Sequence, residues 1–449
     1  MAMIRPETEM KDSGIAWIGD IPSNWETIPL KKIVVDRAGG AWGNEPYENN
    51  STICMRIADF DFDRGVFQDK SETELTKRSY KECQIDKLLL QTNDICIEKS
   101  GGGEKTPVGR AVLFDKPYDA LFANFMDRIR VDNAVSFPKY VEYYLRAMYF
   151  LSVTTLYIKQ TTGIQNLNVT SLLEKEVITL PSLSEQQAIA DYLDETCSKI
   201  DEIIAEAKAS IDEYKELKQS VIFEAVTKGL DKNVEMKDSG VEWMGVIPKH
   251  WSTPKLKYFT NISSGGTPDR NHYEYWNGNV NWIKTGELQN NELYDSEEKI
   301  SELGVANSSA KLFKENTILI AMYGQGKTRG MTALLKVPCT TNQACAGIVM
   351  KSNSPYEIYY LWLTLQASYR ALREKAVGTG QPNLSIGLLK DFYIPLPTLQ
   401  EQKEVINFLK KVMPKYDSLI TEKESLIHDL EAYKKSLIYE VVTGKRKVV

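Results

Sequence analysis

A lysine and a threonine follow two glycines in the segment AMYGQGKTRG (residues 321–330), a combination that phosphate-binding loops use. In such a loop the backbone amides and the lysine hold the phosphates, and the chain continues directly into a helix whose first amides complete the site. Here Thr328 is followed by one arginine, one glycine and the stretch MTALLKVP, which is more typical of a short strand that ends at Pro338. The segment therefore favours a strand, a loop and a second strand.

A related segment, EKSGGGEKTPVGRAVLF (98–114), has Lys105 and Thr106 followed by a proline and another strand-like stretch. We expect both glycine-rich loops to let the backbone approach a partner closely, with Lys327 and Arg329 available to phosphate oxygens. Two alternatives stay open: a nucleotide-binding site built on residues 321–328, and a plain solvent-exposed hairpin.

Other candidate chemistry is sparse. The segment NSPY (353–356) resembles the Asn/Asp-Pro-Pro-Tyr loop of amino-methyltransferases, but Ser354 replaces its first proline, and SFPKY (136–140) favours a shared helix start instead. Three scattered histidines and six cysteines without a C-x-x-C pair argue against a zinc site and against histidine catalysis. We predict no catalytic, cofactor or metal site, and reduced, mostly buried thiols.

Charge and hydropathy place the chain among soluble proteins. The net charge is −6, but the acidic residues concentrate in 180–230, whereas 246–383 carries an excess of basic ones. No apolar stretch approaches the roughly 18 residues of a membrane span, and the N-terminus has no apolar signal core. These features predict a cytoplasmic protein without membrane contact, and the net charge does not exclude a nucleic-acid partner.

The chain contains an internal repeat. Residues 10–31 (MKDSGIAWIGDIPSNWETIPLK) return as residues 236–257 (MKDSGVEWMGVIPKHWSTPKLK), with 13 of the 22 positions identical. LPSLSEQ (180–186) returns as LPTLQEQ (396–402), and TTGIQNLN (161–168) is echoed by GTGQPNLS (378–385). The stretches between these landmarks hardly align. The sequence thus predicts two copies of one framework that carry different, mixed α/β inserts.

The framework segments that follow LP are predicted to be long helices. Apolar residues recur every seven positions, which is typical of a coiled-coil seam. Pro414 is expected to kink or restart the second helix. The residues of the two stripes are Leu193, Ile200, Ala207, Tyr214 and Val221 in the first helix, and Leu409, Tyr416, Leu430 and Leu437 in the second, where Lys423 interrupts the stripe.

Polar and aromatic residues gather on the expected loops of both inserts. Lys and Arg suit phosphates, and Gln, Asn, Arg and Thr suit base edges, so together they are the side chains that a major-groove reader needs. The candidate DNA-binding residues are Arg37, Trp42, Arg56, Lys99, Lys105, Arg110, Lys159, Gln165, Thr267, Arg270, Tyr273, Lys284, Thr285, Tyr323, Gln325, Lys327, Arg329, Thr379 and Gln381.

Taken in this order and duplicated, these segments resemble the DNA-specificity subunit of type I restriction-modification systems. The resemblance rests on the paired MKDSG…W.G.IP..W segments, SGGTPDRNHYEYWNGNVNWIKTGEL (264–288), GTGQPNLS and the paired LP.L.EQ helix starts. The first insert departs from the pattern, because AWGNEPYENN (41–50) replaces the GGTP…YW stretch.

The resemblance implies an α+β fold: two target-recognition domains, each followed by a long helix, with the helices in an antiparallel coiled coil of pseudo-two-fold symmetry. The expected divisions are 1–179, 180–230, 231–395 and 396–449. It also implies a non-catalytic scaffold for double-stranded DNA, two methyltransferase subunits and two restriction/translocase subunits, which use S-adenosylmethionine, ATP and Mg for adenine-N6 methylation or cleavage. Because the inserts differ, we expect an asymmetric, bipartite target.

Apolar helix residues are the candidates for the partner interface. They are Leu193, Ile200, Ile204, Ile211, Leu409, Leu419, Leu426 and Leu437. An alternative function is a coiled-coil adaptor with two protein-binding heads and no DNA sequence preference.

Overall fold

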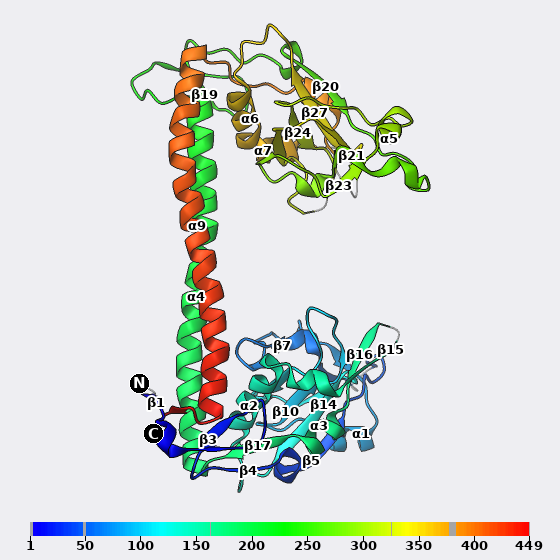
Figure 1. Ribbon diagram of the computed structural model, residues 1–449, viewed down its shortest axis with the longest axis vertical. Coiled ribbons are helices and arrows are strands. Elements are labelled where there is room, and N and C mark those ends of the chain that lie inside the picture. Colours follow the sequence, from blue (N-terminus) through cyan, green and yellow to red (C-terminus); the bar gives the residue numbers. More distant parts are fainter. Residues whose placement is uncertain (1–2, 48–50, 162, 325, 377–382, 449) are drawn as a thin grey trace. The chain divides into compact units, whose positions relative to one another are not determined.

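A computed structural model describes residues 3–47, 51–161, 163–324, 326–376 and 383–448. The chain divides into two compact units. The first contains Met1–Lys208 together with Glu424–Val449, and the second contains Ala209–Lys423. Two long helices, α4 (Leu183–Lys228) and α9 (Leu399–Val442), each contribute one part to each unit (Figure 1). Each unit is therefore a globular domain with parts of both helices.

The long helices pack against each other in the antiparallel sense. In the first unit the beginning of α4, with Leu193, shares a hydrophobic core with the end of α9, with Leu437 and Val441. In the second unit the end of α4, with Val226, shares a core with the beginning of α9, with Leu409. The heptad pattern thus predicted the seam correctly, and the helices contain 46 and 44 residues.

The expected restart at Pro414 does not occur, because α9 continues through this residue. A proline inside a helix lacks the amide that would bond to the carbonyl four residues earlier, here that of Lys410. Packing of the helix on both sides of Pro414 outweighs this loss, since helices in proteins draw most of their stability from tertiary contacts.

The first unit contains a six-stranded sheet in the order β5-β14-β10-β12-β8-β7. Its strands are Val34–Gly39 (β5), Met126–Val131 (β14), Ile95–Glu98 (β10), Ala111–Leu113 (β12), Val66–Phe67 (β8) and Phe60–Asp61 (β7). A second sheet contains Ala120–Phe122 (β13), Thr52–Met55 (β6) and Lys77–Arg78 (β9). A third contains Ser100–Gly101 (β11), Ile164–Leu167 (β16) and Ile158–Thr161 (β15).

The second unit repeats the first five strands of this main sheet and one of the three-stranded sheets. Its main sheet has the order β20-β27-β24-β25-β22, and a smaller sheet has the order β23-β21-β26. The strands are Thr260–Ser264 (β20), Cys345–Met350 (β27), Ile318–Ala321 (β24), Thr332–Leu335 (β25), Asn291–Leu293 (β22), Glu298–Ile300 (β23), Trp276–Ile283 (β21) and Cys339–Thr341 (β26). In both units the fourth and fifth strands of the main sheet pair in parallel and the others are antiparallel. The two inserts therefore share one fold although their sequences hardly align.

Short helices complete each domain. In the first unit α2 (Pro138–Phe150) begins with its proline, as expected. In the second unit α6 (Ile358–Ala367) begins only after Glu357, so Pro355 precedes the helix instead of forming its first turn. The other helices are α1 (Glu82–Leu88), α3 (Val169–Lys175), α5 (Glu302–Ala306), α7 (Tyr369–Glu374) and α8 (Ile386–Lys390).

The repeated tryptophans and the repeated Glu-Gln pairs meet in the structure. The indole nitrogen of Trp25 donates to Glu185 Oε2 at 3.1 Å, and that of Trp251 donates to Glu401 Oε1 at 3.0 Å. Both tryptophans are 1% exposed. Burial of a large aromatic ring with its N–H satisfied is a strong local anchor. These bonds attach the repeated N-terminal segment of each domain to the start of its long helix.

Two further contacts recur. The next residue, Gln186 or Gln402, accepts a hydrogen bond from the backbone amide at the start of the domain helix, at 2.8 Å in both units. The hydroxyl of Tyr140 donates to the carbonyl of Val442, and that of Tyr360 donates to the carbonyl of Val226. The domain helix α2 or α6 is thus tied to both long helices within its own unit.

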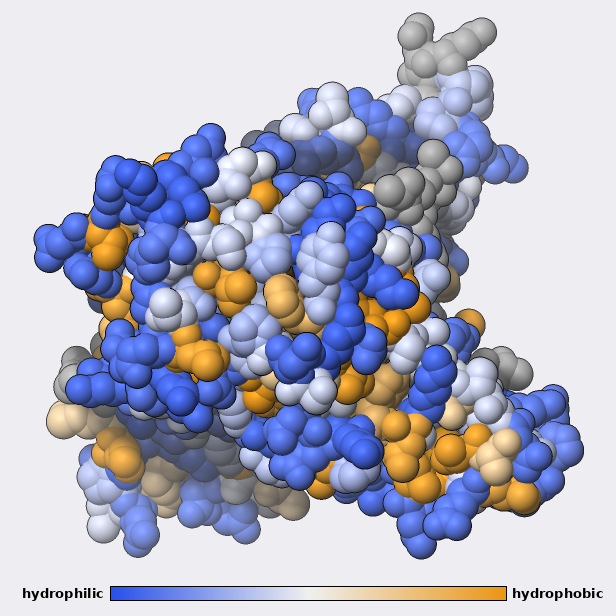
Figure 2. Space-filling model, turned by 90° about the horizontal axis from the view of Figure 1, so that it is seen from above, coloured by the Kyte–Doolittle hydropathy of each residue, from blue (hydrophilic) through white to orange (hydrophobic). Residues whose placement is uncertain are grey.

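The surface is mainly polar. Hydrophilic residues cover most of the face seen in Figure 2, with hydrophobic residues in smaller groups between them. Five of the six cysteines are buried, Cys83 is exposed, and all six are free thiols, as predicted. Among the described residues, no helix combines the length and apolar character needed to cross a membrane.

Candidate nucleic-acid interface

The glycine-rich loop of the second unit connects the antiparallel strands β24 and β25. No helix begins at Thr328, so the arrangement that a phosphate-binding loop requires is not formed there. Helix α7 instead holds the loop backbone: Tyr369 donates to the carbonyl of Lys327 at 2.7 Å, and Arg373 to that of Gly326 at 2.8 Å. The predicted strand–loop–strand is confirmed.

This arrangement displays side chains outward. Lys327 is exposed, and Tyr323 is 43% exposed. Gly326 has a φ of +59°, a conformation that favours glycine, so the sharp turn of the loop depends on it. Arg329 is partly buried, and its carbonyl accepts a hydrogen bond from Arg373.

The glycine-rich loop of the first unit has the same position between strands. β10 and β12 are antiparallel, and Ser100–Gly101 (β11) also pairs with β16. Lys105 is exposed in this loop. Each unit therefore presents a lysine on a glycine-rich loop at the same end of its main sheet.

Two predicted cations of the first unit converge on one buried carboxylate. Arg37 Nη2 lies 2.5 Å and Lys99 Nζ 2.7 Å from the two oxygens of Asp127, which is 2% exposed. Arg37 also donates to Thr170 at 2.6 Å. Two cations against one carboxylate leave a net positive charge, and both side chains remain about 30% exposed. The structure thus brings together two residues that lie far apart in the sequence.

Two other predicted cations of the first unit also bind carboxylates, and Arg56 shares its partner Asp59 with Lys70. Arg110 binds Glu98 at 2.8 Å and lies over the ring of Phe62, while Arg56 binds the fully buried Asp59. Trp42, 39% exposed, faces a guanidinium group instead: that of Arg78 lies 4.2 Å from its ring centre. The charge of Arg110 is balanced by Glu98, whereas Arg56 and Lys70 against one carboxylate leave a net positive charge.

In the second unit Arg270 stacks on Trp276 with a separation of 3.7 Å, and it binds Glu298 at 2.7 Å. Lys284 binds Glu297 at 2.9 Å and Glu298 at 3.1 Å, and these hydrogen bonds raise the pKa of Lys284 above its ordinary value. The lysine is therefore charged at neutral pH, within a network of two cations and two carboxylates.

Three more predicted residues lie close in sequence to Arg270 and Lys284. Tyr273 is 87% exposed at the start of a 3-10 turn, and Thr285 begins a second such turn. The hydroxyl of Thr267 donates to Gln343 at 2.5 Å. Tyr273 is thus presented to solvent on a surface rich in aromatic rings and charges.

The remaining predictions fall on strands or outside the described residues. Lys159 is exposed on β15, whereas Gln165 on β16 is 7% exposed and accepts a hydrogen bond from the amide of Val108. The amide oxygen of Gln165 is thus engaged inside the fold. Gln325, Thr379 and Gln381 lie outside the described residues. As DNA contacts, all of these residues stay predictions.

The candidate partner-interface residues divide into two groups. Leu419 is 38% and Leu426 is 37% exposed. The others are at most 7% exposed and pack in the interior of their own unit, so they do not form an outer surface: Leu193, Ile200, Ile204, Ile211, Leu409 and Leu437.

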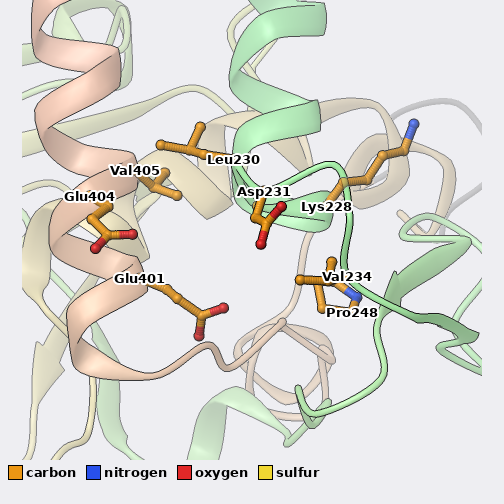
Figure 3. A pocket seen from close by; sticks show the side chains of 9 residues that line it. Lys228, Leu230, Asp231, Val234, Pro248, Glu401, Glu404 and Val405 are labelled. Atoms are coloured by element: carbon orange, nitrogen blue, oxygen red, sulfur yellow. The ribbon is translucent and has the colours of Figure 1, made fainter.

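A small pocket lies in the second unit beside the end of α4 and the beginning of α9 (Figure 3). Asp231, Glu401, Glu404 and Lys228 line it together with apolar residues. The carboxylate of Glu401 accepts a hydrogen bond from the indole nitrogen of Trp251. The same carboxylate lies 2.8 Å from Nε2 of His250. In the described part of the chain, no group of three or more His, Cys, Asp or Glu side chains is placed to hold a metal ion. Tyr356 of the NSPY segment is buried, and its hydroxyl donates to the carbonyl of Pro395; α6 begins two residues later, at Ile358.

Comparison with protein families decides the relationship. The model of the type I restriction modification DNA specificity domain matches residues 22–213 and 248–428. The chain belongs to this family. The two matched ranges correspond to the two copies of the repeat.

Individual relatives agree. The putative type I restriction enzyme MjaX specificity subunit of Methanocaldococcus jannaschii is 25% identical over 446 residues, which is 96% of each chain. The MjaIX specificity subunit of the same organism is 33% identical over 201 residues, and the alignment covers 44% of each chain. The EcoR124I/EcoR124II specificity subunit of Escherichia coli is 26% identical over 263 residues, 58% of each chain.

Two solved structures share the fold. A chain from a study of complex assembly and conformational transition of the type I R-M system matches with a TM-score of 0.69 at 13% identity, over 95% of this chain and 99% of the other. The HsdS subunit from Thermoanaerobacter tengcongensis matches with a TM-score of 0.50 at 14% identity, over 95% and 98% of the two chains.

Proposed function

We propose that this chain is the non-catalytic scaffold that recognises a DNA sequence for a type I restriction-modification complex. Its target is an asymmetric, bipartite site, with one half-site for each unit. The family membership supports the general role, and the difference between the inserts supports the asymmetry.

One observation carries the proposal: two domains whose main sheets share the arrangement of five strands expose different loops. The framework contacts of Trp25 and Trp251 repeat at almost the same distance. The partly exposed side chains differ between the units. In the first unit Lys99 and Arg37 lie beside the glycine loop, whereas in the second unit Arg270 stacks on Trp276. Specificity in protein–DNA complexes resides in such base-contacting loops. A constant framework with variable loops is what two different half-sites require.

The partners follow from the same role. Two methyltransferase subunits and two restriction subunits assemble on the scaffold and use S-adenosylmethionine, ATP and Mg, whereas this chain binds none of these. Exposed apolar residues of the long helices, such as Leu419 and Leu426, support a docking surface for the methyltransferases.

The test is to express the chain with a methyltransferase subunit of the same system in a host without adenine methylation, and to map modified adenines across the genome. A single bipartite motif, methylated on both strands, is expected. Formation of the complex without any motif would contradict the proposal and would favour the adaptor alternative.

A further inference from the structure

A β-hairpin projects its own set of side chains in the first unit. β15 pairs with β16, and the register places Lys159 opposite Asn166 and Gln160 opposite Gln165. Side chains on a strand alternate between its two faces. Lys159, Ile164 and Asn166 therefore share one face of the hairpin, and Gln165 and Leu167 lie on the other.

Burial shows which face is outward. Gln165 and Leu167 are 7% and 6% exposed, so on β16 this face is directed into the domain, whereas Gln160 on β15 is exposed. Ile164 is 53% exposed, and Lys159 and Asn166 are exposed as well. The outward face therefore combines an apolar side chain, Ile164, with the charged Lys159 and the polar amide of Asn166.

The hairpin is held firmly. β16 pairs with Ser100–Gly101 of the glycine loop, and the amide of Leu167 donates to the carbonyl of Lys99 at 2.7 Å. The hydroxyl of Ser100 donates to Asn166 Oδ1 at 2.7 Å, which orients this amide and leaves its NH₂ group as a donor. These contacts fix the backbone of β16 and the amide of Asn166 against the glycine loop.

The electrostatic surroundings favour an anionic ligand. The hairpin carries Lys159 and no acidic residue between 158 and 167. Lys99 is adjacent and shares Asp127 with Arg37, and the exposed Lys105 lies on the paired glycine loop, next to the single carboxylate of Glu104. Positive charge is in excess around the hairpin, as a phosphate-lined groove requires.

The dimensions and chemistry also match a DNA groove. Each strand has four residues and spans about 13 Å, and a major groove about 12 Å wide admits a two-stranded ribbon. There an amide can donate to base or phosphate oxygens, a lysine to guanine or phosphate, and an aliphatic side chain can contact a thymine methyl group.

We infer that the hairpin β15–β16 enters the major groove of the first half-site, with Ile164 and Lys159 reading bases and Asn166 binding the backbone. This inference rests on the proposed function and names the reading element of one unit. Asn166 is assigned to the backbone because its counterpart in the repeat, Asn383, is also an asparagine. Leu384 after it likewise donates to a carbonyl, that of Met322, at 3.0 Å. Both units carry this asparagine, and the sugar-phosphate backbone is the part of the DNA that both half-sites share.

The experiment selects bound duplexes from a random-sequence DNA library with the full chain in complex with its methyltransferase subunit. Wild type, Ile164→Asn and the matched control Ile4→Asn are compared. Ile4 is 77% exposed on the N-terminal strand Met3–Ile4 (β1), away from the hairpin. The inference predicts a changed base preference of about 5-fold or more in one half of the motif for Ile164→Asn, and the wild-type motif for Ile4→Asn.

Asn166→Ala is expected to weaken binding to all selected sequences alike, with the motif unchanged. In wild type, amide hydrogen exchange of 158–167 is expected to slow when the selected duplex is added, a measurement that does not depend on any variant folding. The wild-type motif in Ile164→Asn, or unaltered exchange in the hairpin, would overturn the inference while the proposed function stands. A wild-type complex that selects no motif would overturn the proposed function itself.

Discussion

Lys434 Nζ lies 2.6 and 2.7 Å from the two carboxylate oxygens of Asp201, and Lys218 forms the same ion pair with Asp417. In each unit the pair joins α4 to α9. In both cases 216 residues separate the equivalent positions. The two pairs are thus one repeated contact, and each joins the two long helices within its own unit.

Replacing Lys434 by methionine should lower the free energy of unfolding by about 1.5–3 kcal/mol, the range for a hydrogen bond to a charged group. The side chain is 8% exposed and also donates to the carbonyl of Asp63, so its loss removes hydrogen bonds to the partly buried carboxylate of Asp201 and to this carbonyl. Urea denaturation measures the change. The matched variant Lys218→Met removes a pair whose carboxylate is 57% exposed, and it should lose about 1 kcal/mol or less. Equal losses in the two variants would contradict this explanation.

Tyrosine hydroxyls tie the domain helices to the long helices in both units. Tyr140→Phe should destabilise the protein by about 0.5–1.5 kcal/mol, the net value of one hydrogen bond, because the carbonyl of Val442 loses this donor but keeps that of Thr179. Tyr360→Phe should act similarly through Val226. Calorimetry of both variants tests whether the two anchors are equivalent. If either variant were as stable as the wild type, another donor would have to replace the lost hydroxyl in the hydrogen bond to the carbonyl.

The pH dependence of stability should include a contribution from Glu401. Burial acts to raise the pKa of this carboxyl, but hydrogen bonds from Trp251, Thr398 and His250 outweigh it and hold the pKa below its ordinary value. A depressed folded-state pKa stabilises the protein fully above the unfolded value of about 4.3, and this stability is lost as pH falls through the folded-state pKa.

Glu401→Gln should therefore reduce the acid dependence of the free energy of unfolding below about pH 4.3. Denaturation series at several pH values measure this slope. Trp251→Phe, which removes one donor, should shift the slope in the same direction. An unchanged slope in Glu401→Gln would refute the assignment.

Lys327→Ala should weaken DNA binding by a similar factor for all sequences and reduce the slope of log K against log salt concentration by about 1. Lys327 is exposed on a loop that α7 holds by its backbone, so the substitution removes a charge without disturbing the fold. Fluorescence anisotropy over a salt series measures both quantities. Lys411→Ala, an exposed lysine on α9, is the control and should leave the slope unchanged.

The variant Lys327→Ala also tests the alternative that the chain binds a nucleotide. ATP binding by the wild-type chain that disappears in Lys327→Ala would support that alternative. We expect no ATP binding in either protein, because Thr328 is followed by a loop and a strand and not by a helix.

Much of the architecture follows from the sequence alone. The repeat of the MKDSG segments and the LP.L.EQ helix starts predicted two copies of one framework, and apolar residues at heptad spacing predicted the helical seam. Both signals are local, since sequence identity and helical periodicity can be recognised without knowing which distant segments meet. The composition of the glycine-rich segments likewise predicted a strand, a loop and a strand.

Other features depend on tertiary contacts. The common strand order of the inserts could not be recognised, because different residues satisfy the same core positions and little identity remains. The sequence also could not show that Arg37 and Lys99 share Asp127, or that Pro414 lies within a continuous helix. The clearest case is the direction of successive side chains on a strand. Gln165 and Asn166 are adjacent amides on β16, and only the pairing of this strand with its neighbours decides which one is buried. Side chains on a strand alternate between faces, so the fold determined which of the two can contact DNA.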